Sequence, residues 1–122
     1  MEGLLVTVVD DDESVRESLP DLLHEFGFAS RVFSSPEEFL ASDCIDQTGC
    51  LILDIAMAGM SGPDLQRELT RRKQEIPIIF ITAHASEAVR PRLLKQGAVD
   101  CLFKPFTDTA LLEALNTALM RN

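Results

Sequence analysis

The stretch Leu51-Ile52-Leu53-Asp54 decides the fold of this chain, because it is an apolar run that ends on a single carboxylate. Gly49 precedes it and Gly59 follows it. A short apolar run between glycine-bearing turns is typical of a buried β-strand. Asp54 then lies where the strand leaves the core, and an acid in that place needs a partner or a chemical role.

Three further apolar runs end on a polar side chain in the same way. Residues 4–9 run into Asp10 and Asp11, residues 78–81 run into Thr82, and residues 99–103 run into Lys104. The four predicted strand ends therefore carry carboxylates, a hydroxyl and an ammonium group.

Helical patterns separate these strands. Apolar residues recur at helical spacing over residues 15–26, 65–69 and 111–119, and residues 29–33 read as one more strand. A further helix is expected between residues 83 and 96, where Pro91 either interrupts it or marks a late start. Five strands alternating with five helices predict an α/β fold with a mainly parallel sheet covered on both faces.

The first two helices carry recognisable start and stop signals. Ser14 and Glu17 are placed as one capping box for the first helix, Asp10 to Asp12 offer an alternative cap, and Gly27 is placed as its stop. Pro20 falls inside that helix and predicts a kink. Residues 35–38, Ser-Pro-Glu-Glu, predict a second helix start with a serine cap and a returning glutamate.

The predicted topology brings the polar strand ends together. Right-handed crossovers place the carboxyl end of every parallel strand on one edge of the sheet. In a doubly wound sheet of order 2-1-3-4-5, the ligand crevice forms between strands one and three, which are the two acidic strands here. The residues expected at this edge are Asp10, Asp11, Asp54, Thr82 and Lys104.

Carboxylates crowded into one crevice repel one another, and a hard divalent cation such as Mg²⁺ relieves that repulsion. A bound magnesium ion can also bridge a protein carboxylate to a phosphoryl oxygen. The pattern therefore predicts a phosphoryl-transfer site. Asp54 is the expected nucleophile, Lys104 neutralises charge on the transferring group, and the Thr82 hydroxyl hydrogen-bonds one of its oxygens.

Length and charge narrow the class of protein. The 122 residues fit one domain, and a hydrophobic content of 46% can fill one core. The formal net charge of -9 disfavours binding to nucleic acid and to anionic membranes. The three cysteines, an odd number, suit reduced thiols in the cytoplasm, and we find no signal peptide and no membrane-length apolar run.

The four motifs together resemble the receiver domains of two-component response regulators. The acidic pair at residues 10–12, the phosphoacceptor loop at 54–62, the switch threonine at 81–83 and the lysine motif at 97–105 occur in the family's order and spacing. The resemblance covers essentially all of residues 1–122. It implies a single receiver domain with a flavodoxin-like (βα)5 fold and strand order 2-1-3-4-5.

The resemblance also implies a mechanism. A sensor histidine kinase is expected to phosphorylate Asp54, and Mg²⁺ to be held by Asp11, Asp54 and the Ala56 carbonyl, with Asp10 acting mainly through water. The bond before Pro105 is expected to be cis. A receiver of this kind is not a conventional enzyme, but a phosphoacceptor that takes part in its own phosphoryl transfer and dephosphorylation.

The wording of residues 80–84 and 104–106 resembles the branch whose receivers control a C-terminal helix-turn-helix domain. These 122 residues contain no such output domain, so we expect no direct nucleic acid binding and no membrane contact by this chain. The expected output is a switched protein-interaction face, formed by the fourth helix, fifth strand and fifth helix. Receivers also use that face to form homodimers.

The chain departs from the family at three positions. Ala58 replaces the usual proline of the phosphoacceptor loop, and Cys101 replaces the aromatic residue that commonly moves with Thr82 on activation. Pro91 lies in the fourth helix, on the expected interaction face. These departures predict altered switching with the phosphorylation chemistry kept.

Two other functions fit part of the pattern. One is a degenerate receiver that acts as a phosphorylation-independent interaction module, which Cys101 favours and the retained acids, threonine and lysine oppose. The other is a magnesium-dependent phosphohydrolase of the haloacid dehalogenase type with Asp10 as nucleophile. That family needs a later acidic pair near the chain end, and the sequence has none there. Nucleotide binding is disfavoured because no glycine-rich loop follows the first strand.

Overall fold

A five-stranded parallel sheet lies at the centre of the molecule. The computed structural model describes residues 4–83 and 88–120, and its strands run in the order β2-β1-β3-β4-β5. The strands are β1 Leu5–Val9, β2 Ala29–Phe33, β3 Thr48–Asp54, β4 Ile78–Thr82 and β5 Asp100–Phe103. Every neighbouring pair is parallel, so the predicted flavodoxin-like topology is confirmed.

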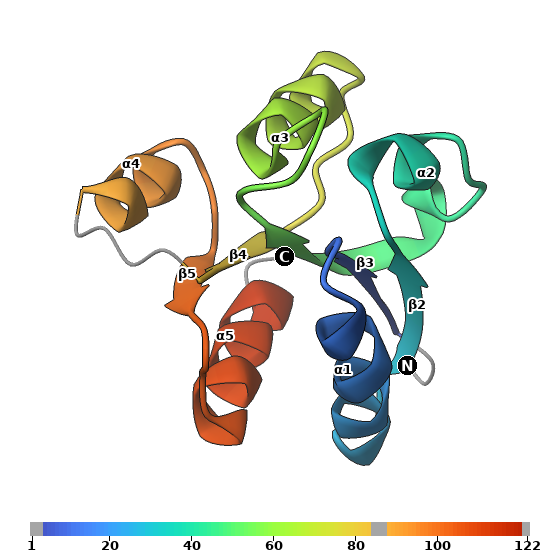
Figure 1. The fold of residues 1–122 in the computed structure, drawn as a ribbon, viewed down its shortest axis with the longest axis vertical. Helices are drawn as coiled ribbons and strands as arrows, with labels where there is room; N and C mark the ends of the chain where they lie inside the picture. Colours follow the sequence, from blue (N-terminus) through green and yellow to red (C-terminus); the bar gives the residue numbers. More distant parts are fainter. Residues whose placement is uncertain (1–3, 84–87, 121–122) are drawn as a thin grey trace.

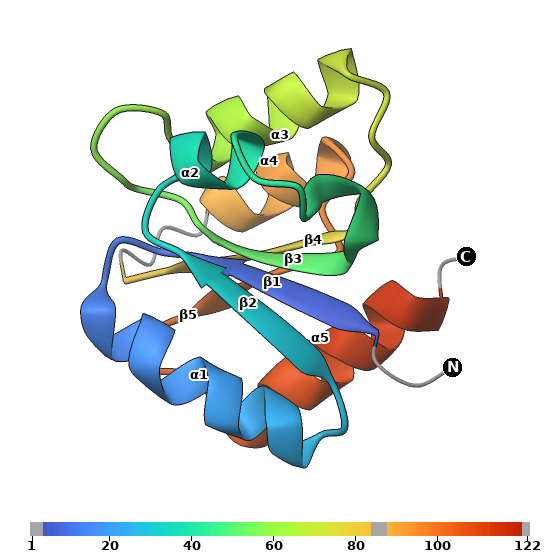
Figure 2. The same cartoon turned by 90° about the vertical axis from the view of Figure 1, so that its right-hand side faces the viewer.

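Helices cover both faces of the sheet (Figure 1). Helices α1 and α5 pack on one face, and α2, α3 and α4 pack on the other, as the view from the side also shows (Figure 2). The helices are α1 Glu13–Glu25, α2 Pro36–Leu40, α3 Gly62–Arg71, α4 Val89–Lys95 and α5 Asp108–Met120, with a short 3-10 helix η1 at Ile45–Gln47.

Strand β3 is buried on both faces, which explains its continuous apolar sequence. Cys50 and Ile52 belong to the core that packs against α1 and α5, whereas Leu51 and Leu53 belong to the core under α2, α3 and α4. All four side chains are fully buried. The strand therefore packs in both hydrophobic layers. Its last residue, Asp54, lies where the carboxyl ends of the parallel strands meet.

The start of α1 differs from the prediction. The capping box of Ser14 and Glu17 is wrong, because Asp12 is the N-cap and its carboxylate accepts hydrogen bonds from the Ser14 amide and hydroxyl, at 3.0 and 2.8 Å. An aspartate two residues earlier thus provides the acceptor that was assigned to Ser14. Gly27 has φ +94 after the last turn, as its role as a stop requires. Pro20 does lie inside α1, and the kink stays a prediction.

The capping of α2 and α3 is partly as predicted. The Ser35 hydroxyl accepts the Glu38 amide at 3.1 Å, but the Glu38 carboxylate returns to the Ser34 amide, one residue before the expected donor. Helix α3 begins with a reciprocal capping box between Ser61 and Asp64. This second box follows the Ser-x-x-Asp pattern and could have been predicted from it.

The late start of the fourth helix is confirmed. Helix α4 begins at Val89, and Pro91 is its third residue, where a proline costs little because the first amides of a helix have no partner within it. Residues 84–87, over which an earlier start was considered, lie outside the described residues. Over residues 4–83 and 88–120, no helix has the length and apolar character needed to cross a membrane.

We predict that Gly62→Ala destabilises the protein more than Gly27→Ala does. A Cβ atom on Gly62 would lie 2.4 Å from the Asp54 carbonyl oxygen, so the main chain itself must move, at a cost of about 2–3 kcal/mol. Gly27 has a positive φ but open space around it, so that substitution should cost about 1 kcal/mol. Urea denaturation measures both losses. Equal losses would show that the close approach of Gly62 to β3 is not a packing constraint.

Candidate functional site

Asp10 lies directly after β1 and is fully buried. Its amide donates to the Phe33 carbonyl at 3.1 Å, which ties the residue to the end of β2. Its Oδ1 accepts the Asp12 amide at 2.9 Å, and this bond orients the carboxylate within the turn that leads into α1. Asp11, the next residue, is exposed. The two acids therefore present one fixed and one open carboxylate.

Asp54 meets these acids because β1 and β3 are neighbours in the sheet. Val9 pairs with Leu53, so the residues that follow each of them emerge side by side. One carboxylate oxygen from each of Asp10, Asp11 and Asp54 lies within 4.8 Å of the other two. The relative exposure of Asp54 is 6%, so the phosphoacceptor candidate is nearly buried rather than on the surface.

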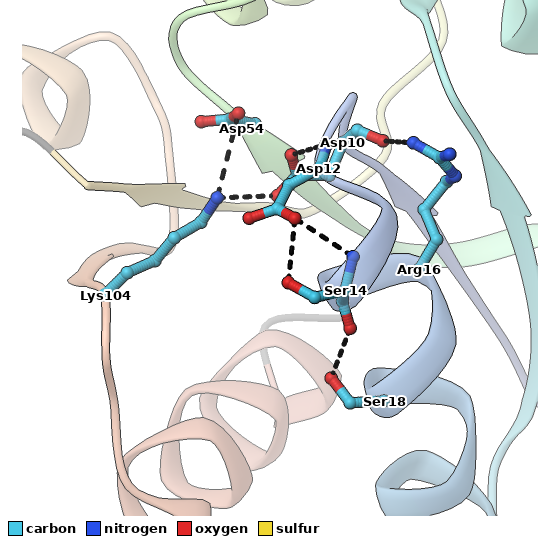
Figure 3. A network of polar contacts seen from close by, with 7 residues as sticks. All are labelled: Asp10, Asp12, Ser14, Arg16, Ser18, Asp54 and Lys104. Carbon is cyan, nitrogen blue, oxygen red and sulfur yellow. Dashed lines mark hydrogen bonds and ion pairs between the residues drawn. The ribbon is translucent and has the colours of Figure 1, made fainter.

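Lys104, near the other end of the chain, extends its side chain towards Asp10 and Asp54 (Figure 3). Its Nζ lies 2.8 Å from Asp10 Oδ2 and 3.8 Å from Asp54 Oδ2. The lysine follows β5, and the bond between it and Pro105 is cis, as expected. One ammonium group thus stands between two carboxylates of neighbouring strands.

Three carboxylates and only one ammonium group lie together at this site. The pKa of Asp54 is raised from 3.8 to about 7, first by burial and then by the adjacent Asp10 carboxylate, while the Lys104 ammonium acts in the opposite direction. Burial lowers the pKa of Lys104, but its hydrogen bond to Asp10 and the nearby carboxylates outweigh burial, so the net pKa is raised. The lysine stays charged, and Asp54 is left with excess negative charge around it.

Thr82 and Ala56 complete the set of predicted site residues. Thr82 is the last residue of β4, the strand next to β3, and its exposure is 2%. Ala56 lies exposed in the loop after β3, and its amide lowers the pKa of Asp54 through a hydrogen bond. The structure therefore gathers all the predicted side chains at one edge of the sheet.

Two residues near the site were not predicted from the sequence. Arg16 on α1 donates from Nη1 to the Asp10 carbonyl at 2.9 Å (Figure 3). Glu37 on α2 accepts the Met60 amide at 3.2 Å and so contacts the loop that follows Asp54. Neither contact has a signal in residue spacing, because each joins segments that are brought together only by the fold.

Cys101 lies in an apolar core rather than among the charged residues at the ends of the strands. It lies in β5 with an exposure of 2% and packs in the core under α2, α3 and α4. Burial raises the pKa of its thiol, which keeps it protonated near neutral pH. Cys44, Cys50 and Cys101 are all free and buried. A small core side chain thus fills the position where an aromatic switch residue was expected.

Comparison with known proteins agrees with this geometry. Residues 6–116 match the family model described as the response regulator receiver domain. This chain belongs to that family. Receiver domains of response regulators are phosphorylated by histidine kinases, and the order of the strands and the acidic cluster of this receiver agree with its membership.

Two curated relatives are similar to this receiver along nearly its whole length. Nodulation protein W of Bradyrhizobium diazoefficiens is 46% identical over 118 residues, which are 97% of this receiver and 52% of the relative. The transcriptional regulatory protein FixJ of Azorhizobium caulinodans is 38% identical over 121 residues, which are 99% of this receiver and 57% of the relative. The chain therefore spans about half the length of these curated relatives.

Solved structures of similar receivers share the fold. The response regulator StyR has a TM-score of 0.88 and 47% identity, covering 97% of this chain and 60% of StyR. The structure named FixJ-N has a TM-score of 0.87 and 40% identity, covering 100% of this chain and 98% of that one.

We predict that Asp54→Asn stabilises the metal-free receiver at pH 8 by about 1–2 kcal/mol, after allowance for solvent screening. Well below pH 3.8 the carboxyl is protonated in both the folded and the unfolded chain and carries no penalty. As pH rises towards 7 the unfolded chain ionises while the buried Asp54 resists, so the parent loses stability and the variant does not. Urea denaturation at pH 4.5 and pH 8 should show a gain that grows with pH. A gain that is the same at both values would show that the ionisation of Asp54 is not its cause.

Proposed function

We propose that this receiver accepts a phosphoryl group on Asp54 from a sensor histidine kinase in a Mg²⁺-dependent reaction. The observation that carries the proposal is the convergence of three carboxylates and one lysine at the carboxyl edge of the sheet, with Lys104 Nζ 2.8 Å from Asp10 and 3.8 Å from Asp54. Family membership supports it, because receivers of response regulators are phosphorylated by histidine kinases.

The donor set at this edge fits magnesium. It consists only of oxygen atoms, from one buried, one exposed and one nearly buried carboxylate, and hard oxygen ligands are what Mg²⁺ prefers. Asp11, Asp54 and the Ala56 carbonyl would hold the ion, with Asp10 acting mainly through water. When bound, the ion would offset the carboxylate repulsion and supply positive charge beside the phosphoryl oxygens.

The side chains of the receiver itself then have distinct roles. A carboxylate oxygen of Asp54 attacks the phosphorus, and the bond from phosphorus to the donor's leaving atom breaks as the acyl phosphate forms. Lys104 moves from the Asp10–Asp54 pair towards the phosphoryl oxygens and neutralises their charge. The Thr82 hydroxyl donates a hydrogen bond to one of these oxygens. In the later dephosphorylation step, the same groups would assist the attack of water on phosphorus, which breaks the bond to Asp54, releases inorganic phosphate and restores the carboxylate.

A groove beside Lys104 is suited to the protein that donates the phosphoryl group. A hollow of about 700 Å³ lies between α1 and the segment that joins β5 to α5. Val15 and Leu22 line it from α1, and Pro105 and Phe106 line it from the other side. Apolar walls next to the reactive edge would let a kinase helix dock while its phosphohistidine reaches Asp54.

The proposed output is a change in the face formed by α4, β5 and α5. Arg90 at the start of α4 pairs with Asp100 at the start of β5 at 2.7 Å, so the position of α4 is tied to the strand that leads to Lys104. Phosphorylation would shift the equilibrium of this face towards a form that binds a partner or a second copy of the receiver. Transcription would then be controlled, in the cytoplasm, through an output domain outside these 122 residues.

We predict that the parent chain gains one phosphoryl group when it is incubated with magnesium and acetyl phosphate, and that Asp54→Asn gains none. Intact-mass spectrometry measures the gain, and chelation of magnesium should suppress it in the parent. No gain under excess donor would favour the phosphorylation-independent interaction module. A gain in both proteins would place the nucleophile elsewhere, with Asp10 the first residue to examine.

A further inference from the structure

The main chain of the loop between β3 and α3 is hydrogen-bonded at the two ends of the loop, and the Met57 and Met60 side chains pack against the core under α2, α3 and α4. The Ile55 amide donates to the Ile81 carbonyl at 3.1 Å, and the Gly62 amide donates to the Ile55 carbonyl at 2.9 Å. These bonds close the base of the loop. They leave residues 57–60 without a main-chain bond to any other described helix or strand.

The main chain at the tip of this loop donates a hydrogen bond to one side chain of another element. Glu37, in the first turn of α2, accepts the Met60 amide through Oε2 at 3.2 Å. Figure 2 shows the loop that leads into α3 passing beside α2. Within residues 4–83 and 88–120, it is the only hydrogen bond from another helix or strand to residues 57–60.

Gly59 fits the same carboxylate closely. Its φ is +78, which disfavours any residue with a side chain, and a Cβ atom there would lie 3.0 Å from Glu37 Oε2. Two successive residues of the loop, Gly59 and Met60, therefore lie against the same oxygen atom of Glu37. Next to them, Ala58 adds neither a side-chain hydrogen bond nor the fixed φ that a proline would give.

From this contact we infer that Glu37 is a positioning residue for the phosphoacceptor loop. By holding Met60 it fixes the tip of the loop, and with it the direction of the Ala56 carbonyl, which is an expected ligand of the metal. Glu37 touches neither metal nor substrate. The inference rests on the proposed function for its metal-binding consequence, but not for the order of the loop itself.

The first test measures the order of the loop without metal or phosphodonor. Hydrogen exchange of the Met60 amide, followed by NMR, should become about fivefold faster in Glu37→Ala than in the parent, because the amide loses its acceptor. Glu37→Gln keeps an acceptor oxygen and should restore most of the protection. Glu113→Ala is the matched control, because Glu113 is an exposed glutamate on α5, on the opposite face of the sheet.

The second test measures the effect on metal binding by calorimetric titration with Mg²⁺. Glu37→Ala should weaken magnesium affinity about fivefold, less than the loss of a group bonded directly to a metal ligand, while Glu37→Gln and Glu113→Ala should stay within about twofold of the parent. Urea denaturation should show that Glu37→Ala is still folded. A parent that binds no magnesium would overturn the proposed function and leave the exchange result standing. Unchanged Met60 exchange, or magnesium affinity equal to that of Glu113→Ala, would overturn the positioning role.

Discussion

The ion pair between Lys104 and Asp10 is the contact on which the functional edge of this receiver depends. It joins residues near opposite ends of the chain, with Lys104 Nζ 2.8 Å from Asp10 Oδ2. The Asp10 side of the pair has no exposed surface. A buried charge that loses its partner costs several kcal/mol, so the ends of β1 and β5 are held to each other through this bond. The parallel topology makes the contact available, because it places both strand ends on the same edge of the sheet.

The same ion pair does not neutralise all the negative charge of the site. One ammonium group serves two neighbouring carboxylates, and it is closer to Asp10 than to Asp54. Burial and the charge of Asp10 therefore raise the pKa of Asp54 to about 7. A second positive charge would stabilise the ionised Asp54, and a phosphoryl group brings oxygens to which Lys104 can turn. The ionised Asp54 therefore lowers the stability of the metal-free fold at the place where a cation and a phosphoryl group are expected to bind.

The sheet and its edge could be predicted from the sequence, because apolar runs that stop on polar residues report directly on buried strands and their ends. The burial of β3 on both faces follows from a pattern of this kind, whereas Pro91 allowed either an interruption or a late start of α4, and the structure has the late start. The cap of α1 was misassigned because Asp12 and Ser14 both suit an N-cap, and only the turn geometry chooses between them. The contacts of Arg16 with Asp10 and of Glu37 with Met60 could not be predicted, since they arise where separate segments meet. The roles of the site residues remain predictions.

The most direct measurement of where the phosphoryl group resides is reduction of the phosphodonor-treated receiver with borohydride. Hydride reduces an acyl phosphate to an alcohol and releases phosphate, so the modified aspartate becomes homoserine and can be located by peptide mass spectrometry. Homoserine at position 54 alone, and only when magnesium was present during the reaction, is the predicted result. Homoserine at position 10 or 11, or at no position, would contradict the assignment of Asp54 as the phosphoacceptor.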